Sequence, residues 1–459
     1  MPTLLSFLRR LSHLGWLLFT LTIALGDRAP NFILIFIDDQ GYQDLGCYGS
    51  PNIQTPNLDR MAAEGLRFTD FYSLAPVCSA SRAALMTGCY PLRVGITGVL
   101  FPRHRVGLNP AETTMAEVLK GEGYATACVG KWHLGHHPEF LPTNHGFDRY
   151  YGIPYSNDMD GVQGKNRNLD RAWGENDVTP WNVPLMRNEV IVERPAQQAT
   201  ITRRYTEEAI RFIEEHAEAP FFLYLPHTMP HIPLFVSEAF YQEDPQKAYA
   251  STIAEIDWSV GQILKTVKRL GLDEDTLVVY TSDNGPWLGM KHHGGSALPL
   301  RDGKFSTYEG GMRVPCLARW PGKIAPGQVT GEVAATFDLL PTFAHYAGAT
   351  LSTDQVIDGN NIAGLLEGRE ESPHEAFFYY RGNRLEAVRR GPWKLNRKGQ
   401  RRRNQSVNSS LHHLLNDIGE TSNLIVNHPG IAQELEELAQ SFDASLKANR
   451  RPVGNLDNL

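Results

Sequence analysis

The sequence predicts an α/β domain built on a mostly parallel sheet, followed by a smaller α+β domain. Apolar, β-branched runs recur along the chain with amphipathic stretches between them, which is the pattern of buried parallel strands alternating with helices. The 459 residues, 42% of them apolar, suffice for one large core and a small second domain. Near residue 370 the alternation gives way to shorter segments and a basic run, which places the second domain at the C-terminal end.

The N-terminal segment is typical of an export signal. Arg9 and Arg10 precede an apolar stretch at 14–25, and Gly26-Asp27 ends it. About a dozen apolar residues are too few to span a bilayer comfortably and suit the core of a signal peptide. We therefore expect residues 1–27 to be a signal peptide and the protein to be secreted or periplasmic, or lysosomal in a eukaryote. An uncleaved membrane anchor is the alternative.

We expect the large domain to cover residues 28–368 and the small one 369–459. The predicted strands of the large domain are 31–37, 124–129, 221–225, 276–281 and 314–319. One predicted helix starts at Thr55-Pro56, with Thr55 as the N-cap and Pro56 at the first helical position. Another covers about 245–270, where apolar residues recur at helical spacing.

The C-terminal region has its own strand and helix signals. Segments 386–390 and 393–395 flank Gly391-Pro392 and predict a hairpin. A helix is predicted over 431–447. The basic run 397–403 is more often a solvated loop than a binding patch.

Charge and cysteine content exclude some classes of protein. The net charge is −7, so nothing indicates a nucleic-acid surface, and an anionic substrate would need a local cluster of cations.

Five cysteines are too few to suggest a disulfide framework. If Cys78 is used chemically, three pairings of the other four remain open, although the apolar surroundings of Cys128 favour a buried free thiol. Those four are Cys47, Cys89, Cys128 and Cys316.

Oxygen-bearing side chains follow two of the predicted strands, and sites in parallel sheets form at such strand ends. Asp38 and Asp39 follow the first strand, and Asp283, Asn284 and Gly285 follow the strand at 276–281. Adjacent carboxylates are costly unless a cation neutralises them, and oxygen ligands suit a hard cation such as calcium or magnesium. Solvated loop acids and an ordinary Asx-Gly turn are the alternatives.

Cys78 stands at the start of a predicted helix. The helix formers at 83–86 follow it, and Arg82 lies one turn away on the same face. A helix N-terminus with an arginine beside it is an anion site. A buried structural cysteine is the commoner role for a lone cysteine.

Further polar groups follow other predicted strands. Lys131 and His133 lie two residues apart after the strand at 124–129, so in an extended segment their side chains would point the same way. His227 and His231 both follow the strand at 221–225, and spacing does not choose between them. Lys304 follows the Gly-rich stretch at 294–295. His292 and His293 are more typical of structural or surface positions.

These segments together resemble the sulfatase family, in particular its arylsulfatase A and N-acetylgalactosamine-6-sulfatase branch. The run Cys78-Ser79-Ala80-Ser81-Arg82 with Thr87-Gly88 is similar to the first signature of the family, and 123–126 with 130–135 to the second. Similar segments also lie at 55–59, 146–148, 152–156 and 308–311. The resemblance covers nearly the whole chain after the signal segment.

The resemblance implies an alkaline-phosphatase-like α/β/α sandwich that hydrolyses sulfate esters. Cys78 would be oxidised by a maturation enzyme to formylglycine (3-oxoalanine), whose hydrate attacks sulfur. One divalent cation is implied, Ca²⁺ before Mg²⁺, with ligands Asp38, Asp39, Cys78, Asp283 and Asn284. The implied sulfate-contacting residues are Arg82, Lys131, His133, Ser156, His231 and Lys304. His231 is preferred over His227 because a proline follows it two residues later.

Within this resemblance, His231 would protonate the leaving oxygen and His133 would take the proton of the second hydroxyl. Ala80 replaces the commoner proline of the first signature, which leaves the maturation route open. Asp302 could pair with Lys304 or shape the substrate side. Neither the substrate nor the oligomeric state can be read from the sequence.

The sequence is compatible with three functions. A sulfuric ester hydrolase acting on an aryl sulfate, sulfated sugar or glycolipid is the first. A phosphodiester or phosphonate hydrolase on the same fold is the second, and Asn284 argues against it. A non-catalytic sulfoglycan-binding protein with unmodified Cys78 is the third. Specificity is expected in the polar loop 158–187, where Trp173 and Trp181 could stack on sugar rings or simply pack in the core.

Overall fold

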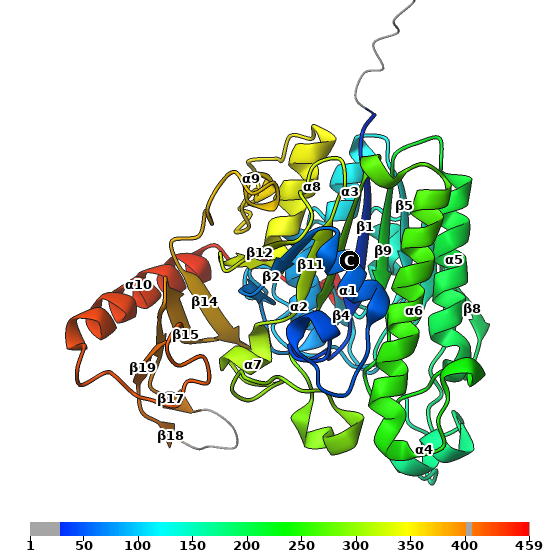
Figure 1. Cartoon of the computed structure of the whole chain (residues 1–459), viewed down its shortest axis with the longest axis horizontal. Coiled ribbons are helices and arrows are strands. Elements are labelled where there is room, and N and C mark those ends of the chain that lie inside the picture. Colours follow the sequence, from blue (N-terminus) through cyan, green and yellow to red (C-terminus); the bar gives the residue numbers. More distant parts are fainter. Residues whose placement is uncertain (1–27, 401–405, 459) are drawn as a thin grey trace, which may run out of the picture.

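The computed structural model describes residues 28–400 and 406–458. The expected signal peptide and the part of the basic run at 401–403 therefore lie outside the described residues. Figure 1 shows a large domain on the right and a smaller C-terminal lobe, coloured orange to red, on the left. None of the helices within the described ranges is long and apolar enough to cross a membrane.

A ten-stranded mixed sheet forms the centre of the large domain. β1 (Asn31–Ile37) lies in its middle and pairs in parallel with β9 (Phe221–Pro226) and β10 (Thr276–Ser282). β5 (Ala125–Val129) and β6 (Arg149–Gly152) extend the parallel part beyond β9. The outer strands are β7 (Leu185–Arg187) and β8 (Val190–Glu193) on one side and β11 (Cys316–Arg319), β2 (Leu66–Phe68) and β12 (Gln328–Thr330) on the other. The expected α/β architecture is confirmed, with β11 antiparallel to β10.

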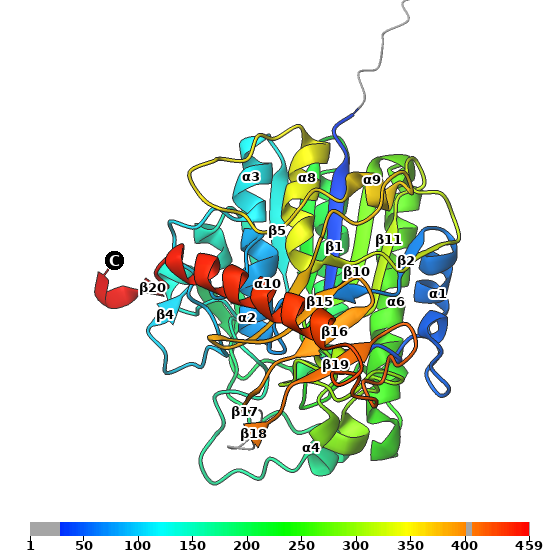
Figure 2. The same cartoon turned by 90° about the vertical axis from the view of Figure 1, so that its left-hand side faces the viewer.

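Helices cover both faces of this sheet (Figures 1 and 2). On one face lie α1 (Pro56–Ala63), α5 (Ile201–Glu215) and α6 (Ala248–Arg269), which share a core with Ile33 and Ile35 of β1. On the other face lie α2 (Cys78–Thr87), α3 (Met115–Gly121), α8 (Leu339–Ala347) and α9 (Ala363–Leu366), which share a core with Phe32 and Leu34. Alternate residues of the buried central strand thus supply two separate cores.

The C-terminal lobe is a four-stranded antiparallel sheet with one helix against it. Its strands are β14 (Phe377–Arg381), β15 (Arg384–Arg390), β16 (Trp393–Asn396) and β19 (Ser410–His413). α10 (Pro429–Ala448) crosses this sheet (Figure 2), and the rings of Phe378 and Phe442 stack with centroids 3.8 Å apart. The predicted hairpin and helix are both present.

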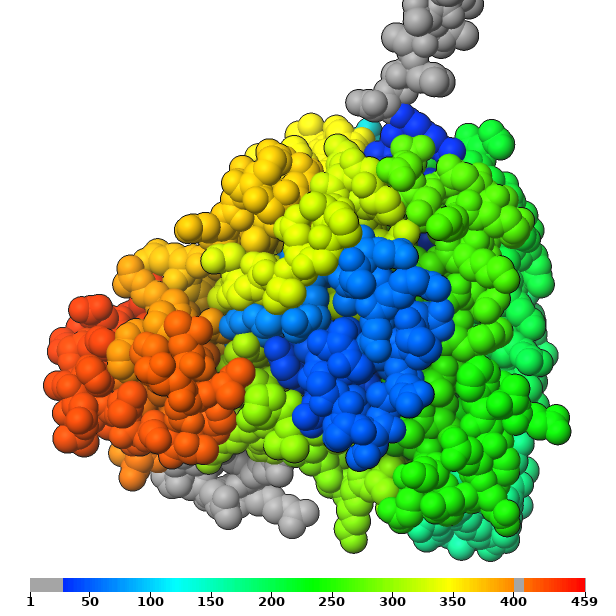
Figure 3. All heavy atoms as spheres, viewed as in Figure 1, coloured from blue at the N-terminus to red at the C-terminus, as the bar shows by residue number. Residues whose placement is uncertain are grey.

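The chain returns to the large domain after α10. β20 (Gly454–Asn455) pairs with β4 (Val106–Gly107), and Arg451 donates to the buried carboxylate of Glu112 at 2.7 Å. Figure 3 shows the lobe projecting from the side of the large domain. The division at residue 368 stays a prediction. The remaining strands and α-helices are β3 (Phe71–Tyr72), α4 (Leu169–Glu175), α7 (Glu309–Met312), β13 (Ala334–Ala335), β17 (Gly399–Gln400) and β18 (Ser406–Val407). Short 3₁₀ segments, among them η8 (Leu288–His293), connect the larger elements.

α1 begins where the sequence predicts, but its cap differs from the prediction. Thr55 stands at the N-cap position without capping the helix, because its hydroxyl donates to Asp59 and accepts from the backbone of Gly46. The carboxylate of Asp257, on α6, accepts instead from the backbone N–H groups of Asn57 and Leu58. A residue 200 positions away in the sequence therefore caps the helix.

The cysteines are all unpaired. Cys47, Cys78, Cys89, Cys128 and Cys316 are free thiols, so none of the three pairings considered for the four cysteines other than Cys78 occurs. Cys128 is fully buried in β5, as expected from its apolar surroundings.

Candidate active site

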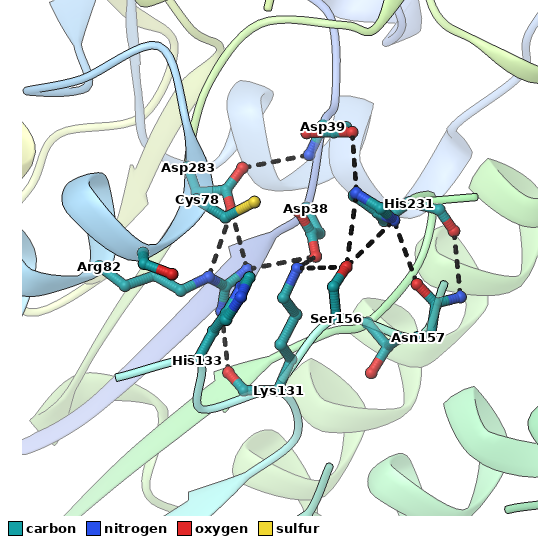
Figure 4. Close-up of polar contacts among 12 residues, drawn as sticks. Asp38, Asp39, Cys78, Arg82, Lys131, His133, Ser156, Asn157, His231 and Asp283 are labelled. Atoms are coloured by element: carbon teal, nitrogen blue, oxygen red, sulfur yellow. Dashed lines mark hydrogen bonds and ion pairs between the residues drawn. The ribbon is translucent and has the colours of Figure 1, made fainter. Parts of the chain in front are cut away.

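The polar residues that follow β1, β5, β6, β9 and β10 gather at one edge of the sheet, beside the first turn of α2 (Figure 4). The carboxyl ends of parallel strands meet at this edge, which is why residues far apart in the sequence come together. Every one of these side chains is almost completely buried. The gathered residues are Asp38, Asp39, Cys78, Arg82, Lys131, His133, Ser156, His231, Asp283, Asn284 and Lys304.

Three carboxylates and one amide form the acidic part of the site. The backbone N–H of Asp39 donates to Asp283 at 3.1 Å, and the amide of Asn284 donates to the carboxylate of Asp39 at 2.7 Å. Burial and the neighbouring Asp38 raise the pKa of Asp283, although Arg82 opposes them. Burial would also raise the pKa of Asp38, but the charges of Lys131, His231 and Arg82 outweigh it and hold that pKa well below its usual range.

Three cations face these carboxylates. Arg82 donates from Nη2 to Asp283 at 2.9 Å, and Lys131 donates to Asp38 and, at 3.1 Å, to the hydroxyl of Ser156. Lys304 donates to Asp39 at 2.7 Å, and its Nζ lies 3.8 Å from the sulfur of Cys78. In low-dielectric surroundings such fixed cations are an effective binding site for an anion.

Cys78 begins α2, as the sequence predicts, and its side chain is 2% exposed. Burial raises the pKa of its thiol to about 12, although Lys131 and Lys304 act in the opposite direction. A thiol with that pKa is almost wholly protonated at neutral pH and is a weak nucleophile. As encoded, this cysteine is therefore poorly suited to attack a substrate.

The backbone conformation of His133 differs from the one predicted from the sequence. Its φ is +60°, so the backbone at His133 is in the left-handed region, whereas the sequence predicts an extended segment. The ring Nε2 of His133 lies 2.9 Å from the carbonyl oxygen of Leu100, and Nδ1 is buried without a hydrogen-bond partner among the described residues. Burial, followed by the charges of Lys131 and Arg82, lowers the pKa of His133 well below its usual value, which keeps the ring neutral.

His231 is the histidine after β9 that faces the site. Its Nδ1 lies 3.3 Å from the hydroxyl of Ser156, and its Nε2 lies 3.6 Å from the carboxylate of Asp39. His227, by contrast, is directed to the hydroxyl of Ser259 on α6, at 3.3 Å. The order of preference between the two histidines agrees with this placement.

The donor set fits a divalent cation. Oδ1 of Asp38 and Oδ1 of Asn284 are buried and find no hydrogen-bond partner within residues 28–400 and 406–458, and such orphaned oxygens are costly without a cation. Ligand atoms of Asp38, Asp39, Cys78 and His231 lie within 4.8 Å of one another. This grouping includes His231, which the sequence-based ligand set lacked. Asp283 and Asn284 stay predicted ligands.

Sequence reasoning missed two residues that shape the site. Oδ1 of Asn157 lies 3.2 Å from Nδ1 of His231, and its Nδ2 donates to the backbone of Pro233 at 3.0 Å. The ring of Trp287 lies 5.9 Å from the ring of His231 and 4.8 Å from Nζ of Lys304. Asn157 directly follows the predicted segment 152–156, and Trp287 lies two residues after Gly285. This proximity is the one signal that could have identified them.

The remaining candidate residues have other contacts. Trp173 and Trp181 are each 2% exposed, so packing and not stacking on sugar rings accounts for them. His292 and His293 contact Asp170. Asp302 accepts from the backbone N–H of Gly303 at 3.0 Å.

Two family sequence models match the chain. The model described as Sulfatase matches residues 30–349. A second, described as N-sulphoglucosamine sulphohydrolase, C-terminal, matches residues 301–443. Between them they cover the large domain and most of the C-terminal lobe.

Individual proteins are similar over most of their length. Arylsulfatase A of Homo sapiens is 44% identical over 364 residues, which cover 77% of this chain and 71% of that protein. N-acetylgalactosamine-6-sulfatase of Mus musculus is 40% identical over 386 residues, covering 80% of this chain and 71% of that protein. Among solved structures, Ps i-CgsB in complex with k-i-k-neocarrahexaose superposes with a TM-score of 0.79 at 31% identity, covering 91% of this chain and 93% of the other.

Proposed function

The chain belongs to the sulfatase family and is a sulfuric ester hydrolase, and from that premise we propose that position 78 carries its nucleophile and that sulfated carbohydrates are its substrates. The observation that carries the proposal is the position of Cys78. It lies at the start of α2, with Lys304 within 3.8 Å and Arg82 one turn away. Sulfated substrates carry the negative charge that this cluster of cations would bind.

The encoded thiol does not account for catalysis, because burial raises its pKa to about 12. In formylglycine, which the family implies at position 78, the hydrated aldehyde supplies one hydroxyl for attack on sulfur and a second whose loss of a proton releases the sulfate. A maturation enzyme would carry out this oxidation. The alanine at position 80 leaves its type open.

The neighbouring side chains have the charges and proton-transfer groups that this reaction needs. Lys131, Lys304 and Arg82 would offset the charge on the sulfate oxygens. His231, next to the hydroxyl of Ser156, would protonate the leaving oxygen, and Asn157 would hold its ring in place. His133 is neutral and has an open Nδ1, so it can accept the proton of the second hydroxyl.

A divalent cation, Ca²⁺ before Mg²⁺, would be held by Asp38, Asp39, Asp283, Asn284 and the modified residue 78. It would supply positive charge that favours ionisation of a hydroxyl at position 78. The buried carboxylates Asp38, Asp39 and Asp283 face the cations Arg82, Lys131 and Lys304. These charges balance, so a bound divalent ion would give the site the net positive charge that an anionic ester requires.

Sulfated carbohydrates are the proposed class of substrate because a structural relative was solved with a k-i-k-neocarrahexaose bound. N-acetylgalactosamine-6-sulfatase, another relative, is named for an amino-sugar sulfate. Screening a panel of sulfated oligosaccharides against an aryl sulfate, with inorganic sulfate as the readout, tests this choice. A strong preference for the aryl sulfate would contradict it.

We also propose export through residues 1–27, which N-terminal sequencing of the secreted protein would test.

The decisive test is the substitution Cys78→Ala. Purified wild-type protein should show the mass decrease of thiol-to-aldehyde conversion at position 78, and the variant should lose activity by at least about 1,000-fold. Cys47→Ala, at a half-buried cysteine outside the site, is the matched control and should keep its activity. Retained activity in Cys78→Ala would contradict the assignment of the nucleophile. Equal rates on a phosphate ester and a sulfate ester would favour the phosphohydrolase alternative.

A further inference from the structure

A second cluster of ligand-type side chains lies outside the site built on Cys78. Asp170 is in the first turn of α4, and His292 and His293 end the 3₁₀ segment η8. The Nε2 atoms of both histidines point at the same carboxylate oxygen of Asp170, at 2.7 Å and 2.8 Å. Ligand atoms of all three residues lie within 4.8 Å of one another.

The backbone holds this arrangement from both sides. Lys291 has φ 55° and ψ −121°, a kink that turns the two consecutive histidines toward the same point, and their ring centroids are 4.4 Å apart. α4 is anchored by the buried Trp173, whose indole N–H donates to the carbonyl of Gln242 at 2.8 Å. On the other side, the N–H of Ser296 donates to the buried Asp44 at 2.8 Å.

We propose that Asp170, His292 and His293 bind a divalent metal ion of the zinc type. Two imidazoles and one carboxylate are a donor set that suits zinc, and three protein ligands leave a fourth position for water. The site thus differs in kind from the oxygen-rich site at the strand ends, which suits a hard cation. His293 is 4% exposed, whereas Asp170 is 54% exposed, so an ion can enter from solvent.

The present distances require a small movement. Ligand atoms on a tetrahedral zinc ion with bonds of about 2.0–2.1 Å are about 3.3 Å apart. The nitrogen–oxygen distances here are 2.7 Å and 2.8 Å, so the carboxylate must withdraw by about half an ångström. Asp170 can do so because its side chain is more than half exposed. The competing description is that the two imidazoles simply hydrogen-bond to one carboxylate.

Such an ion would join the polar loop 158–187 to the segment that follows Trp287. α4 belongs to the polar loop 158–187, and η8 follows directly on Trp287, whose ring contacts His231 and Lys304. The ion would hold the loop that carries Trp287 against α4. It would thereby restrict the movement of Trp287 beside His231 and Lys304. Asp170, His292 and His293 are positioning residues in this role, since they touch none of the reacting groups.

Metal binding by the full chain in saturating Ca²⁺ tests the proposal. Co²⁺ serves as the spectroscopic probe and Zn²⁺ as its competitor. Wild-type protein should bind one equivalent of Co²⁺ that gives the visible bands of tetrahedral cobalt. A thiolate charge-transfer band should be absent, because its presence would mark binding at Cys78. The double variant His292→Ala/His293→Ala should bind this equivalent at least about 100-fold more weakly, and Asp170→Asn about 10-fold more weakly.

His136→Ala/His137→Ala is the matched control. These two histidines are also consecutive, with ring centroids 4.2 Å apart, and should leave the affinity unchanged. Zn²⁺ should raise the Tm of wild type and of this control but not of the His292/His293 variant. Equal affinity in wild type and in the His292/His293 variant would overturn the proposal, as would no binding by wild type at micromolar Zn²⁺. Asp170→Asn, at an exposed position, provides the comparison if the double variant does not fold.

Discussion

Arg82 is a fully buried charge, and its neighbours depend on it. Its guanidinium contacts Asp283 at 2.9 Å and Asp38 at 3.6 Å, and all three side chains are inaccessible to solvent. Removing one partner of a buried ion pair leaves an uncompensated charge. We expect Arg82→Met to lower the free energy of unfolding by about 3–5 kcal/mol in urea denaturation.

Arg60→Met is the control for that measurement. Arg60 and Glu64 form an exposed pair on α1 at 4.0 Å, and such pairs contribute about 0.5 kcal/mol or less. Equal losses in the two variants would mean that the charges at the strand ends are not interdependent.

His145 should make the protein sensitive to acid. Neither of its ring nitrogens has a hydrogen-bond partner in the described part of the chain, and burial lowers its pKa from 6.5 to about 4. The unfolded chain therefore takes up a proton near pH 6.5 while the folded protein does not until about pH 4. Stability is complete above pH 6.5 and is lost as the pH falls through this window, by about 3 kcal/mol for this one group.

The variant His145→Phe removes the titrating group and keeps a ring against Trp132. Urea denaturation at pH 7 and pH 4.5 should show a loss of stability that is about 2–3 kcal/mol smaller in this variant than in wild type. Parallel pH dependences in the two proteins would contradict the prediction, since all other titrating groups are common to both.

The sequence indicates site residues best where a motif holds them in a fixed local frame. Cys78 and Arg82 are one helical turn apart, and Asp38 follows directly on a buried strand, so spacing alone places them. The contacts of His231 with Ser156 and Asn157 arise from separate loops and depend on tertiary packing. The placement of His133 depends on a positive φ that nothing in the sequence signals.

At the scale of single elements, the turn after β5 has the strictest requirement. Gly130 has φ +138°, and a Cβ placed there would lie 1.9 Å from the carbonyl oxygen of Pro226. The N–H of Lys131 donates to that same oxygen at 2.7 Å, so the close approach is what positions the lysine. Gly130→Ala should lower the Tm and reduce kcat, because the strained backbone shifts Lys131.

Gly121→Ala is the control for this substitution. Gly121 ends α3, where an added Cβ meets nothing within 4 Å, and alanine there should be neutral or raise stability by up to about 1 kcal/mol. Unchanged activity in Gly130→Ala would show that the turn tolerates a side chain.

Element positions could be predicted from the sequence, but their pairing could not. The runs that form β1, β9 and β10 are apolar on both faces, which identifies buried strands without giving their order in the sheet. The antiparallel direction of β11 and the capping of α1 by Asp257 are both long-range events. Local propensity carries no information on either.

Across the whole molecule, one buried lysine connects the two domains. Lys394 of β16 donates to Glu309 of α7 at 2.8 Å and lies 3.1 Å from Glu420. Burial would raise the pKa of Glu309, but Lys394 and Arg313 hold it well below its usual range. We expect Lys394→Met to cost about 3–5 kcal/mol of stability, measured by urea denaturation.

Lys398→Met is the control, because Lys398 is exposed in the same region and should change stability by less than about 0.5 kcal/mol. A small effect of Lys394→Met would mean that other contacts hold the domains together. These include the buried pair of Arg389 with Asp70 at 2.6 Å and the packing of Tyr72 and Tyr90 against the C-terminal lobe.

The position of β1 between β9 and β10 also sets an order of events during synthesis. Cys78 is 2% exposed once the domain is folded, so the maturation enzyme proposed for this residue would have to act while the chain is still open. The sheet cannot close before β10 has been made, and Thr276 follows Cys78 by about 200 residues. At about 5–20 residues per second this leaves roughly 10–40 s. If position 78 is converted as proposed, the fraction of active molecules would depend on the rate of modification relative to the rate of translation, and slower translation should raise that fraction.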